Sequence, residues 1–298
     1  MVNAFKNYCK NIKIKRVYIF SLFVGTIIGL LCYSSVKCYS NDMSKSNKNI
    51  LNMRHFKEYR GLLCYWDFNG KQPLVSKGKY RYRLREGKTP VSIVDGGPFS
   101  GKSISLTEGQ YLYIPRSECP ALNLHGKNAQ VTVLAWVKRK PKNYIECEAI
   151  AGMWNETEKK RQYCLFINIQ LYNSADQVSG HVSGVGGPTP GNRWCVDVSI
   201  GKQKVNFDEW TFIGFSYDSK KIKSYYNGLF DVREGTNPYD YKLGLFNGEK
   251  EGSDFTVGAV NRSGVMGNFF AGQIGMLAIF DRALSDNEIM QLSSLKMI

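Results

Sequence analysis

The most regular chemical pattern in the chain alternates cations with larger apolar side chains. The cations are Lys79, Arg81, Arg83 and Arg85, and the residues between them are Tyr80, Tyr82 and Leu84. In an extended strand, successive side chains point to opposite faces, so the four cations would share one face. Guanidinium groups bind carboxylates and sulfates through paired hydrogen bonds. This pattern predicts a docking strip for sulfated or sialylated glycans or anionic lipid headgroups. The alternative is a solvated face, or an edge strand whose charge prevents aggregation.

Sugar-binding side chains occur in and near a glycine-rich segment, residues 183–194. Trp194 and Trp154 offer indole rings that could stack on a sugar, while Asn192 and His181 could bind hydroxyl groups. Long loops on a rigid scaffold often carry binding sites. These four residues are therefore candidate glycan ligands. The alternative is a flexible connection with Trp194 in the core.

Catalytic chemistry has one weak candidate, the pair Glu146 and Glu148. Retaining glycosidases need two carboxylates about 5–5.5 Å apart, and residues two apart on a strand face the same side. We favour the alternative, an exposed strand end beside a loop. No catalytic residue is therefore predicted, and no cysteine and histidine spacing suggests zinc.

Five cysteines follow the N-terminal region: Cys64, Cys119, Cys147, Cys164 and Cys195. An odd number implies a free thiol or an intermolecular bridge. Cys147 and Cys164 flank a short predicted hairpin, which makes them the best candidates for a disulfide. Asn155 and Asn261 begin N-glycosylation sequons, which are used only if the domain is lumenal.

The net charge of +15 over 298 residues is unevenly distributed. Residues 1–60 hold 11 Lys and Arg against 2 acids, and residues 71–88 hold seven against one. Everything else from residue 61 onward is neutral. A nucleic-acid-binding protein usually spreads phosphate contacts over a whole face, so we predict no nucleic-acid partner.

Residues 1–38 resemble a membrane-targeting leader. Several cations precede an uncharged apolar run at residues 17–36, which is long enough to cross a bilayer core of about 30 Å. The long basic flank and long apolar run favour a signal anchor over a cleaved signal peptide, and a buried core helix is the remaining alternative. Both leading interpretations place the protein in the secretory pathway. Residues 39–60 are polar and are predicted to form a tether.

Residues 61–298 are predicted to form an all-β sandwich. Apolar or alternating runs of five to ten residues recur between glycines, asparagines and prolines, with no alternation of helices. Residues 210–228 read as a hairpin that turns at residues 218–220. One short helix is expected at the end, where Ser285 and Glu288 form a capping box.

The order of these runs resembles that of a known family. GLLCYWDFN, DGGPFSGKSISLTEGQYLYIP, VTVLAWVKRK, EWTFIGFSYDSKKIKSYYNG and FFAGQIGMLAIFDRALSDNEIMQL are similar, in that order, to motifs of the laminin-G-like jelly roll. This domain belongs to the concanavalin A-like lectin/glucanase superfamily. The resemblance implies a jelly roll of two antiparallel sheets, surface or extracellular placement, and recognition of glycans or glycoproteins.

The resemblance also implies a candidate calcium site, because related domains often bind calcium near the sandwich rim. Asp67 and Asp95 lie on the matching segments. The chain departs from the family in its closing strand, where Ile274, Gly275 and Met276 replace the usual Ile-Asp-Glu. We therefore expect a non-catalytic lectin-like domain, secreted or membrane-tethered. The alternatives are a polysaccharide hydrolase or lyase on the same sandwich, or a structural surface protein that makes protein contacts.

Overall fold

The computed structural model describes residues 56–142 and 146–295. The predicted leader, residues 1–38 with the apolar run 17–36, lies outside the described residues, as does the predicted tether up to residue 55. No helix within the described ranges is both long enough and apolar enough to span a membrane. The last residues assigned to the tether pack on the body, since the ring of Phe56 lies 4.8 Å from that of Tyr65 and 5.6 Å from that of Phe99.

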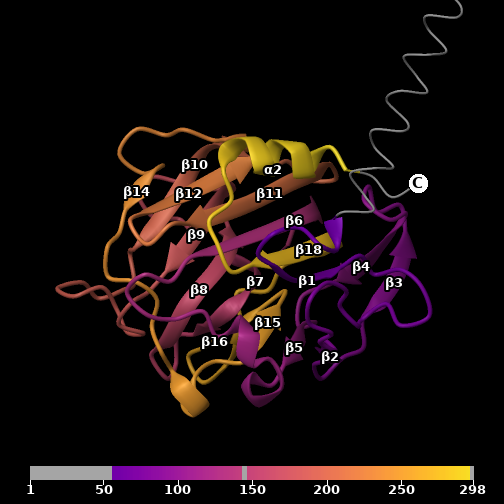
Figure 1. Ribbon diagram of the computed structural model, residues 1–298, viewed down its shortest axis with the longest axis horizontal. Helices are drawn as coiled ribbons and strands as arrows, with labels where there is room; N and C mark the ends of the chain where they lie inside the picture. Colours follow the sequence, from indigo (N-terminus) through magenta and orange to yellow (C-terminus); the bar gives the residue numbers. More distant parts are fainter. Residues whose placement is uncertain (1–55, 143–145, 296–298) are drawn as a thin grey trace, which may run out of the picture. The chain divides into compact units, whose positions relative to one another are not determined.

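The predicted all-β sandwich is confirmed, with two sheets and a short C-terminal helix (Figure 1). In spatial order, the first sheet consists of β13 (Leu229–Phe230), β12 (Lys221–Tyr226), β11 (Trp210–Tyr217), β6 (Val131–Arg139), β18 (Gly272–Phe280), β4 (Lys102–Leu106) and β3 (Ser92–Asp95). Two further strands join it, β1 (Leu62–Trp66) beside β18 and β14 (Tyr239–Asp240) beside β12. Strands far apart in sequence are thus neighbours in this sheet.

The second sheet faces the first. Its order is β10 (Val198–Lys204), β9 (Gln177–Val182), β8 (Lys160–Ile167), β7 (Glu148–Asn155), β15 (Phe255–Val257), β5 (Leu112–Ile114) and β2 (Arg85–Glu86). The small pair β16 (Val260–Arg262) and β17 (Val265–Gly267) attaches to β7. Three short 3-10 helices lie in the connections, η1 (Arg116–Glu118), η2 (Pro120–Leu122) and η3 (Glu249–Glu251).

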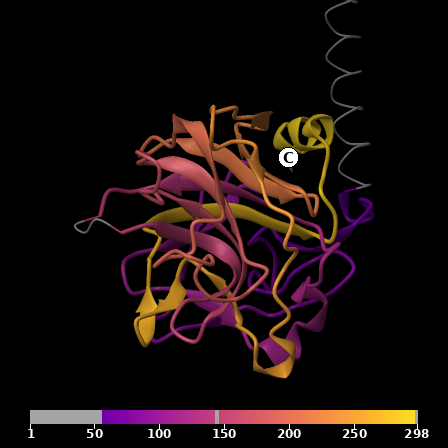
Figure 2. The same ribbon diagram turned by 90° about the vertical axis from the view of Figure 1, so that its left-hand side faces the viewer.

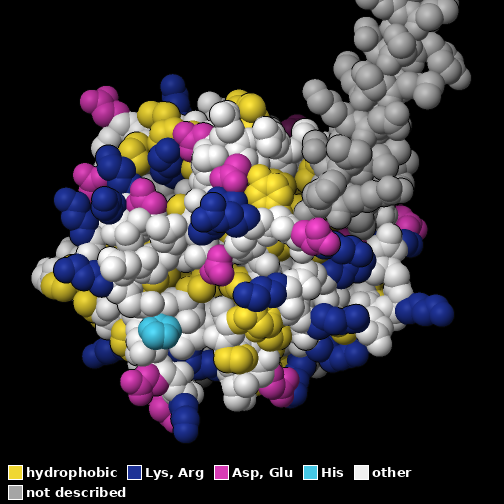
Figure 3. All heavy atoms as spheres, in the orientation of Figure 1, with side chains coloured by type: hydrophobic (Ala, Val, Ile, Leu, Met, Phe, Trp, Pro, Cys, Tyr) yellow, Lys and Arg dark blue, Asp and Glu magenta, His cyan; other side chains and the backbone are white. Residues whose placement is uncertain are grey.

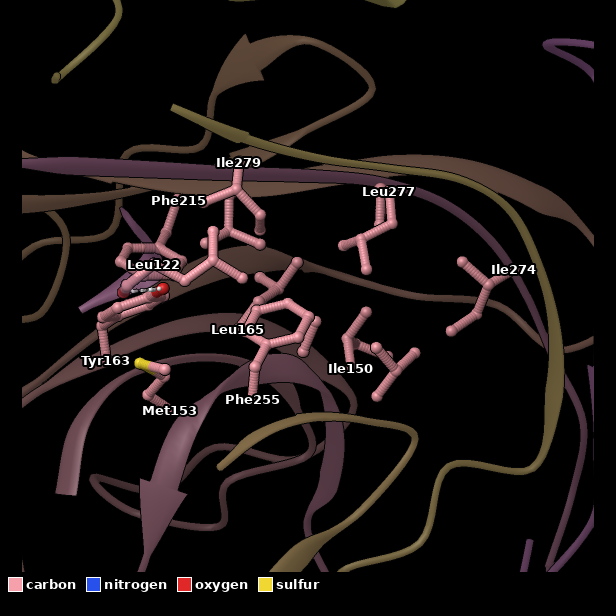
Figure 4. Packing of buried hydrophobic residues seen from close by; sticks show 14 of the residues in the cluster. Leu122, Ile150, Met153, Tyr163, Leu165, Phe215, Phe255, Ile274, Leu277 and Ile279 are labelled. Carbon is pink, nitrogen blue, oxygen red and sulfur yellow. Dashed lines mark hydrogen bonds between the residues drawn. The ribbon is translucent and has the colours of Figure 1, made fainter. Parts of the chain in front are cut away.

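The core lies between the sheets because inward-facing side chains alternate along each strand. Figure 4 shows Phe215, Ile274, Leu277 and Ile279 of the first sheet facing Met153, Leu165 and Phe255 of the second. All seven are fully buried. The Tyr163 hydroxyl satisfies its hydrogen-bonding need by donating to the carbonyl of Leu122 at 2.8 Å.

Local signals in the sequence also fold as expected. The hairpin β11–β12 turns at Asp218, whose carboxylate accepts hydrogen bonds from the backbone amides of Lys220 and Lys221. The helix α2 (Asp286–Ser293) begins with the predicted capping box between Ser285 and Glu288. It covers the outside of the first sheet near β13 and is seen nearly end-on in Figure 2.

A buried ion network joins the two sheets at one end. Arg139, on β6, is 2% exposed, and its guanidinium lies 2.6 Å from the Glu148 carboxylate on β7, which is 0% exposed. The same guanidinium pairs with Asp176 at 2.7 Å and donates to the carbonyl of Val205 at 3.2 Å. Burial by itself lowers the pKa of Arg139, but the hydrogen bonds with Glu148 and Asp176 outweigh burial and raise it.

We predict that Arg139→Met destabilises the protein by about 3–5 kcal/mol, because the buried Glu148 carboxylate loses its hydrogen bonds with the guanidinium and keeps only the Lys142 ammonium at 3.9 Å. Replacing both residues with methionine should recover part of that loss. Urea denaturation measures both effects, with the exposed Arg83→Met as the matched control. A loss no larger for Arg139→Met than for Arg83→Met would contradict the assigned role of this network.

Candidate functional site

The alternation predicted for the cationic strip is present. Arg81, Arg83 and Arg85 are exposed, while Tyr82 and Leu84 are 7% and 1% exposed. The strand expected over this segment is confined to its end: only Arg85 and Glu86 form β2, at the edge of the second sheet, where Arg85 pairs with Tyr113 of β5. In Figure 3, Lys and Arg side chains gather over the region where β2 and β5 lie in Figure 1.

The four cations of the strip do not share one environment. Arg85 forms an ion pair with Glu118, and the Lys79 ammonium lies 5.3 Å from the centroid of the Tyr80 ring. Arg81 lines a surface hollow that Lys79 does not line. The cations of the strip therefore make different contacts and do not form one shared site. The role of the strip in binding an anion stays a prediction.

The loop at residues 183–197 presents an exposed tryptophan. Trp194 is 56% exposed, so the alternative that places it in the core is wrong. The guanidinium of Arg193 lies 4.7 Å from the centroid of the Trp194 indole, and Asn192 is exposed beside it. These side chains form an accessible group that combines an aromatic face, a cation and an amide.

The same loop is anchored by hydrogen bonds at its base. The Thr189 hydroxyl donates to the Asp197 carboxylate at 2.6 Å and accepts from the amide of Val196 at 2.9 Å. The amide of Thr189 donates to the carbonyl of Trp194 at 3.1 Å. The Tyr172 hydroxyl, on the neighbouring connection, donates to the carbonyl of Val196 at 3.3 Å. These contacts tie the base of the loop to the domain, while the side chains at its tip face solvent.

The other two glycan candidates are buried, which corrects their predicted grouping with Trp194. Trp154 is 1% exposed and His181 is 4% exposed, and their ring centroids lie 4.5 Å apart. Both belong to an apolar cluster on the outer face of the second sheet, with Cys164, Phe166 and Cys195. Burial, with the nearby Arg161, lowers the pKa of His181 to about 3, so its ring is neutral near pH 7. A sugar could not reach either side chain while this cluster stays packed.

The candidate calcium ligands are each paired with a lysine. Asp67 is buried and forms an ion pair with Lys77, and Asp95 lies 2.6 Å from the Lys102 ammonium. Among the described residues, no group of three or more acidic, histidine or cysteine side chains is placed to hold a metal ion. This arrangement does not support the predicted calcium site.

The two carboxylates with catalytic spacing do not act together. Glu148 is buried in the ion network with Arg139, so the expectation that it lies at an exposed strand end is wrong. Glu146 is partly exposed and pairs instead with Arg262 at 3.0 Å. The two acids therefore serve different ion pairs.

The departure from the family at Gly275 has a packing cause. Strand β18 bulges between Ile274 and Met276, and the Trp210 ring lies against the bulge. A β-carbon on Gly275 would approach that ring to 3.2 Å, so the indole takes the space that a side chain would need. Trp210 and Trp136 are also half-buried, on the outer face of this sheet.

The cysteines described by the structure are free thiols. The predicted disulfide between Cys147 and Cys164 is therefore not formed, because Cys164 lies opposite Gly152 while Cys147 precedes β7. Burial raises the pKa of Cys147 to about 12, which disfavours its reactive thiolate.

The two sequons lie side by side. Asn155 and Asn261 occupy neighbouring positions on β7 and β16, and the Thr157 hydroxyl of the first sequon bonds to the Asn261 side chain of the second. Both asparagines are half-buried. Their glycosylation stays a prediction.

A laminin G-type family model, that of the concanavalin A-like lectin/glucanases superfamily, matches residues 106–290, which is more than half of the chain. The chain belongs to this superfamily. Residues 62–105, before the matched region, supply β1, β3 and most of β4 to the first sheet of this superfamily member. No curated protein matches the chain in sequence.

Solved structures share the fold of this superfamily member. Domain 4 of an extracellular arabinanase from Geobacillus stearothermophilus, solved with arabinotriose, aligns with a TM-score of 0.54 and 18% identity over 78% of this chain and 98% of that one. The binding domain of botulinum neurotoxin serotype G aligns with a TM-score of 0.51 and 12% identity, over 78% of this chain and 50% of that one. The receptor binding domain of the botulinum neurotoxin C/D mosaic serotype aligns with a TM-score of 0.50 and 12% identity, over 78% of this chain and 51% of that one. At these identities the likeness shows the fold alone.

We predict that Thr189→Val loosens the loop that carries Trp194 in this superfamily member. The change removes the hydroxyl that bonds both Asp197 and Val196, while leaving the side chain nearly the same size. Amide hydrogen exchange should become faster at Val196, with a stability loss of about 1 kcal/mol. Thr107→Val, on an exposed turn, is the control. Unchanged exchange at Val196 would show that the hydroxyl does not fix the loop.

Proposed function

We propose that this protein is a non-catalytic glycan-binding domain that uses Trp194 as its principal sugar contact. The observation that carries the proposal is the exposure of this indole on an anchored loop of a lectin-type sandwich. Tryptophan at a binding surface combines a large apolar face with a hydrogen-bonding group, which suits the mixed apolar and polar surface of a sugar. Arg193 and Asn192 supply polar contacts beside it.

The expectation that the domain lacks catalysis is supported by the two separated acids. Glycoside hydrolysis needs two carboxylates that flank the same bond. Glu148 is bound into a structural ion network, and Glu146 pairs with Arg262. The family relationship supports glycan recognition, since the arabinanase domain of the same fold was solved with an arabinose oligosaccharide.

Glycan-array binding by the full-length chain tests this function. We predict that the wild type binds and that Trp194→Ala weakens binding by roughly tenfold or more, as expected for loss of a stacked aromatic anchor. The matched control is Leu229→Ala, which also removes an exposed apolar side chain, but from the first sheet and away from the Trp194 loop. Wild-type binding that survives Trp194→Ala, or a wild type that binds no glycan, would overturn the proposal.

The proposed setting is the secretory pathway, with the domain tethered to a membrane on its non-cytosolic side. The basic flank and apolar run at residues 17–36 support this placement, and anchoring is favoured over secretion. We predict that enzymatic removal of N-glycans lowers the mass of the protein from a eukaryotic host, and that Asn155→Gln with Asn261→Gln abolishes the shift. A wild-type protein without N-glycans would contradict a lumenal location.

A further inference from the structure

We propose that a cationic hollow at the start of the folded body binds the sulfate or carboxylate group of an acidic saccharide. The hollow has a volume of about 570 Å³, within the range of about 300–1,000 Å³ that is usual for small-molecule sites. Its charged lining consists of Lys57, Lys71, Lys77 and Arg81. No carboxylate lines it among the residues that the structure describes, and Asn69 and Gln72 add neutral hydrogen-bonding groups.

The four cations come from two segments. Lys57 precedes β1, whereas Lys71, Lys77 and Arg81 all lie on the connection from β1 to β2. Only Arg81 is a member of the cationic strip. The hollow is therefore a product of the fold, and the periodicity of the strip does not reveal it.

The connection that carries these cations is held in place by the domain. The backbones of Lys77 and Tyr65 exchange two hydrogen bonds of 2.8 Å. The Ser76 hydroxyl, which is buried, accepts from the amide of Tyr82 at 2.7 Å and donates to the carbonyl of Tyr80 at 3.0 Å. The Lys77 ammonium is also fixed by its ion pair with the buried carboxylate of Asp67. Because the backbone of the connection is preorganised, less entropy is lost on binding than with a loose loop.

The remaining charge of the hollow is not neutralised within the domain. Lys57, Lys71 and Arg81 form no ion pair among the described residues, so even after Lys77 is paired with Asp67 three cations face the hollow. A second hollow, of about 440 Å³ between the β11–β12 hairpin and α2, is lined by side chains of both charges. There, Lys221 and Lys223 are accompanied by three acids, Asp218, Asp286 and Glu288.

The lining selects the chemical class of the ligand. Sulfate and carboxylate groups accept hydrogen bonds from ammonium and guanidinium groups, and arginine binds them in paired fashion. Within the described part of the chain, Val75 is the only large apolar side chain in the lining, so the hollow offers little to a lipid chain. Outside residues 1–60 and 71–88 the chain is neutral, which disfavours an extended polyanion such as nucleic acid. An acidic sugar fits both the size and the charge.

Titration calorimetry on the full-length chain tests the proposal, with sucrose octasulfate as the probe and sucrose as its uncharged counterpart. We expect binding of the sulfated sugar only. Lys71→Glu with Arg81→Glu should weaken that binding by roughly tenfold or more, as expected for loss of charge-assisted hydrogen bonds. Both residues are exposed, so the variant should keep the wild-type melting temperature, and Lys71→Gln with Arg81→Gln provides a milder version.

The matched control is Lys127→Glu with Lys242→Glu, which changes the net charge equally at two exposed lysines outside the hollow. The proposal is overturned if the variant in the hollow binds like the wild type, or if the control loses as much affinity. Binding to phosphatidylserine vesicles without binding to sucrose octasulfate would identify a lipid ligand and also overturn it.

This inference is separable from the role of Trp194. Trp194→Ala should leave binding of sucrose octasulfate unchanged, and the variant in the hollow should leave binding of neutral glycans unchanged. Failure of one experiment therefore does not imply failure of the other.

Discussion

The packing of two apolar sheet faces against each other is the constraint on which the rest of the domain depends. Because side chains alternate along a strand, a shift of one residue in register would exchange every inward and outward group. The buried ion network also constrains the register, since the Glu148 carboxylate between the sheets takes its hydrogen bonds from Arg139 on the opposite sheet. Core and ion network together fix where each connection leaves the sandwich, and so where each exposed side chain points.

The surface groups proposed for binding depend on this rigidity in two ways. Trp194 stands on a loop whose base is closed by Thr189 and Asp197, so its indole stays exposed without the loop being loose. The cationic hollow is assembled from separate segments, and the pairing of Lys77 with the backbone of Tyr65 holds its central connection against β1.

The fold was accessible from sequence because its signals are local. Alternation, turn residues and the capping box at Ser285 each depend on a few neighbouring residues. The order of the motifs then indicated the jelly-roll family. The binding residues were less accessible because burial depends on distant segments. Trp154 and Trp194 look equivalent in sequence, yet one is covered by its cluster and the other is 56% exposed. Likewise, no sequence pattern indicates that Lys57 and Arg81 lie close together. The fold brings both residues to the same hollow.

The central claim is that sugar contacts Trp194 and not another aromatic surface of the sandwich. The indole N–H resonances of the tryptophans test this directly, in a spectrum recorded with and without a glycan selected on the array. Trp66 and Trp154 are buried, while Trp136 and Trp210 are half-buried on the outer face of the first sheet. We predict that the glycan shifts the Trp194 resonance alone. A shift at Trp136 or Trp210 with none at Trp194 would contradict the account and move the site to the outer face of the first sheet.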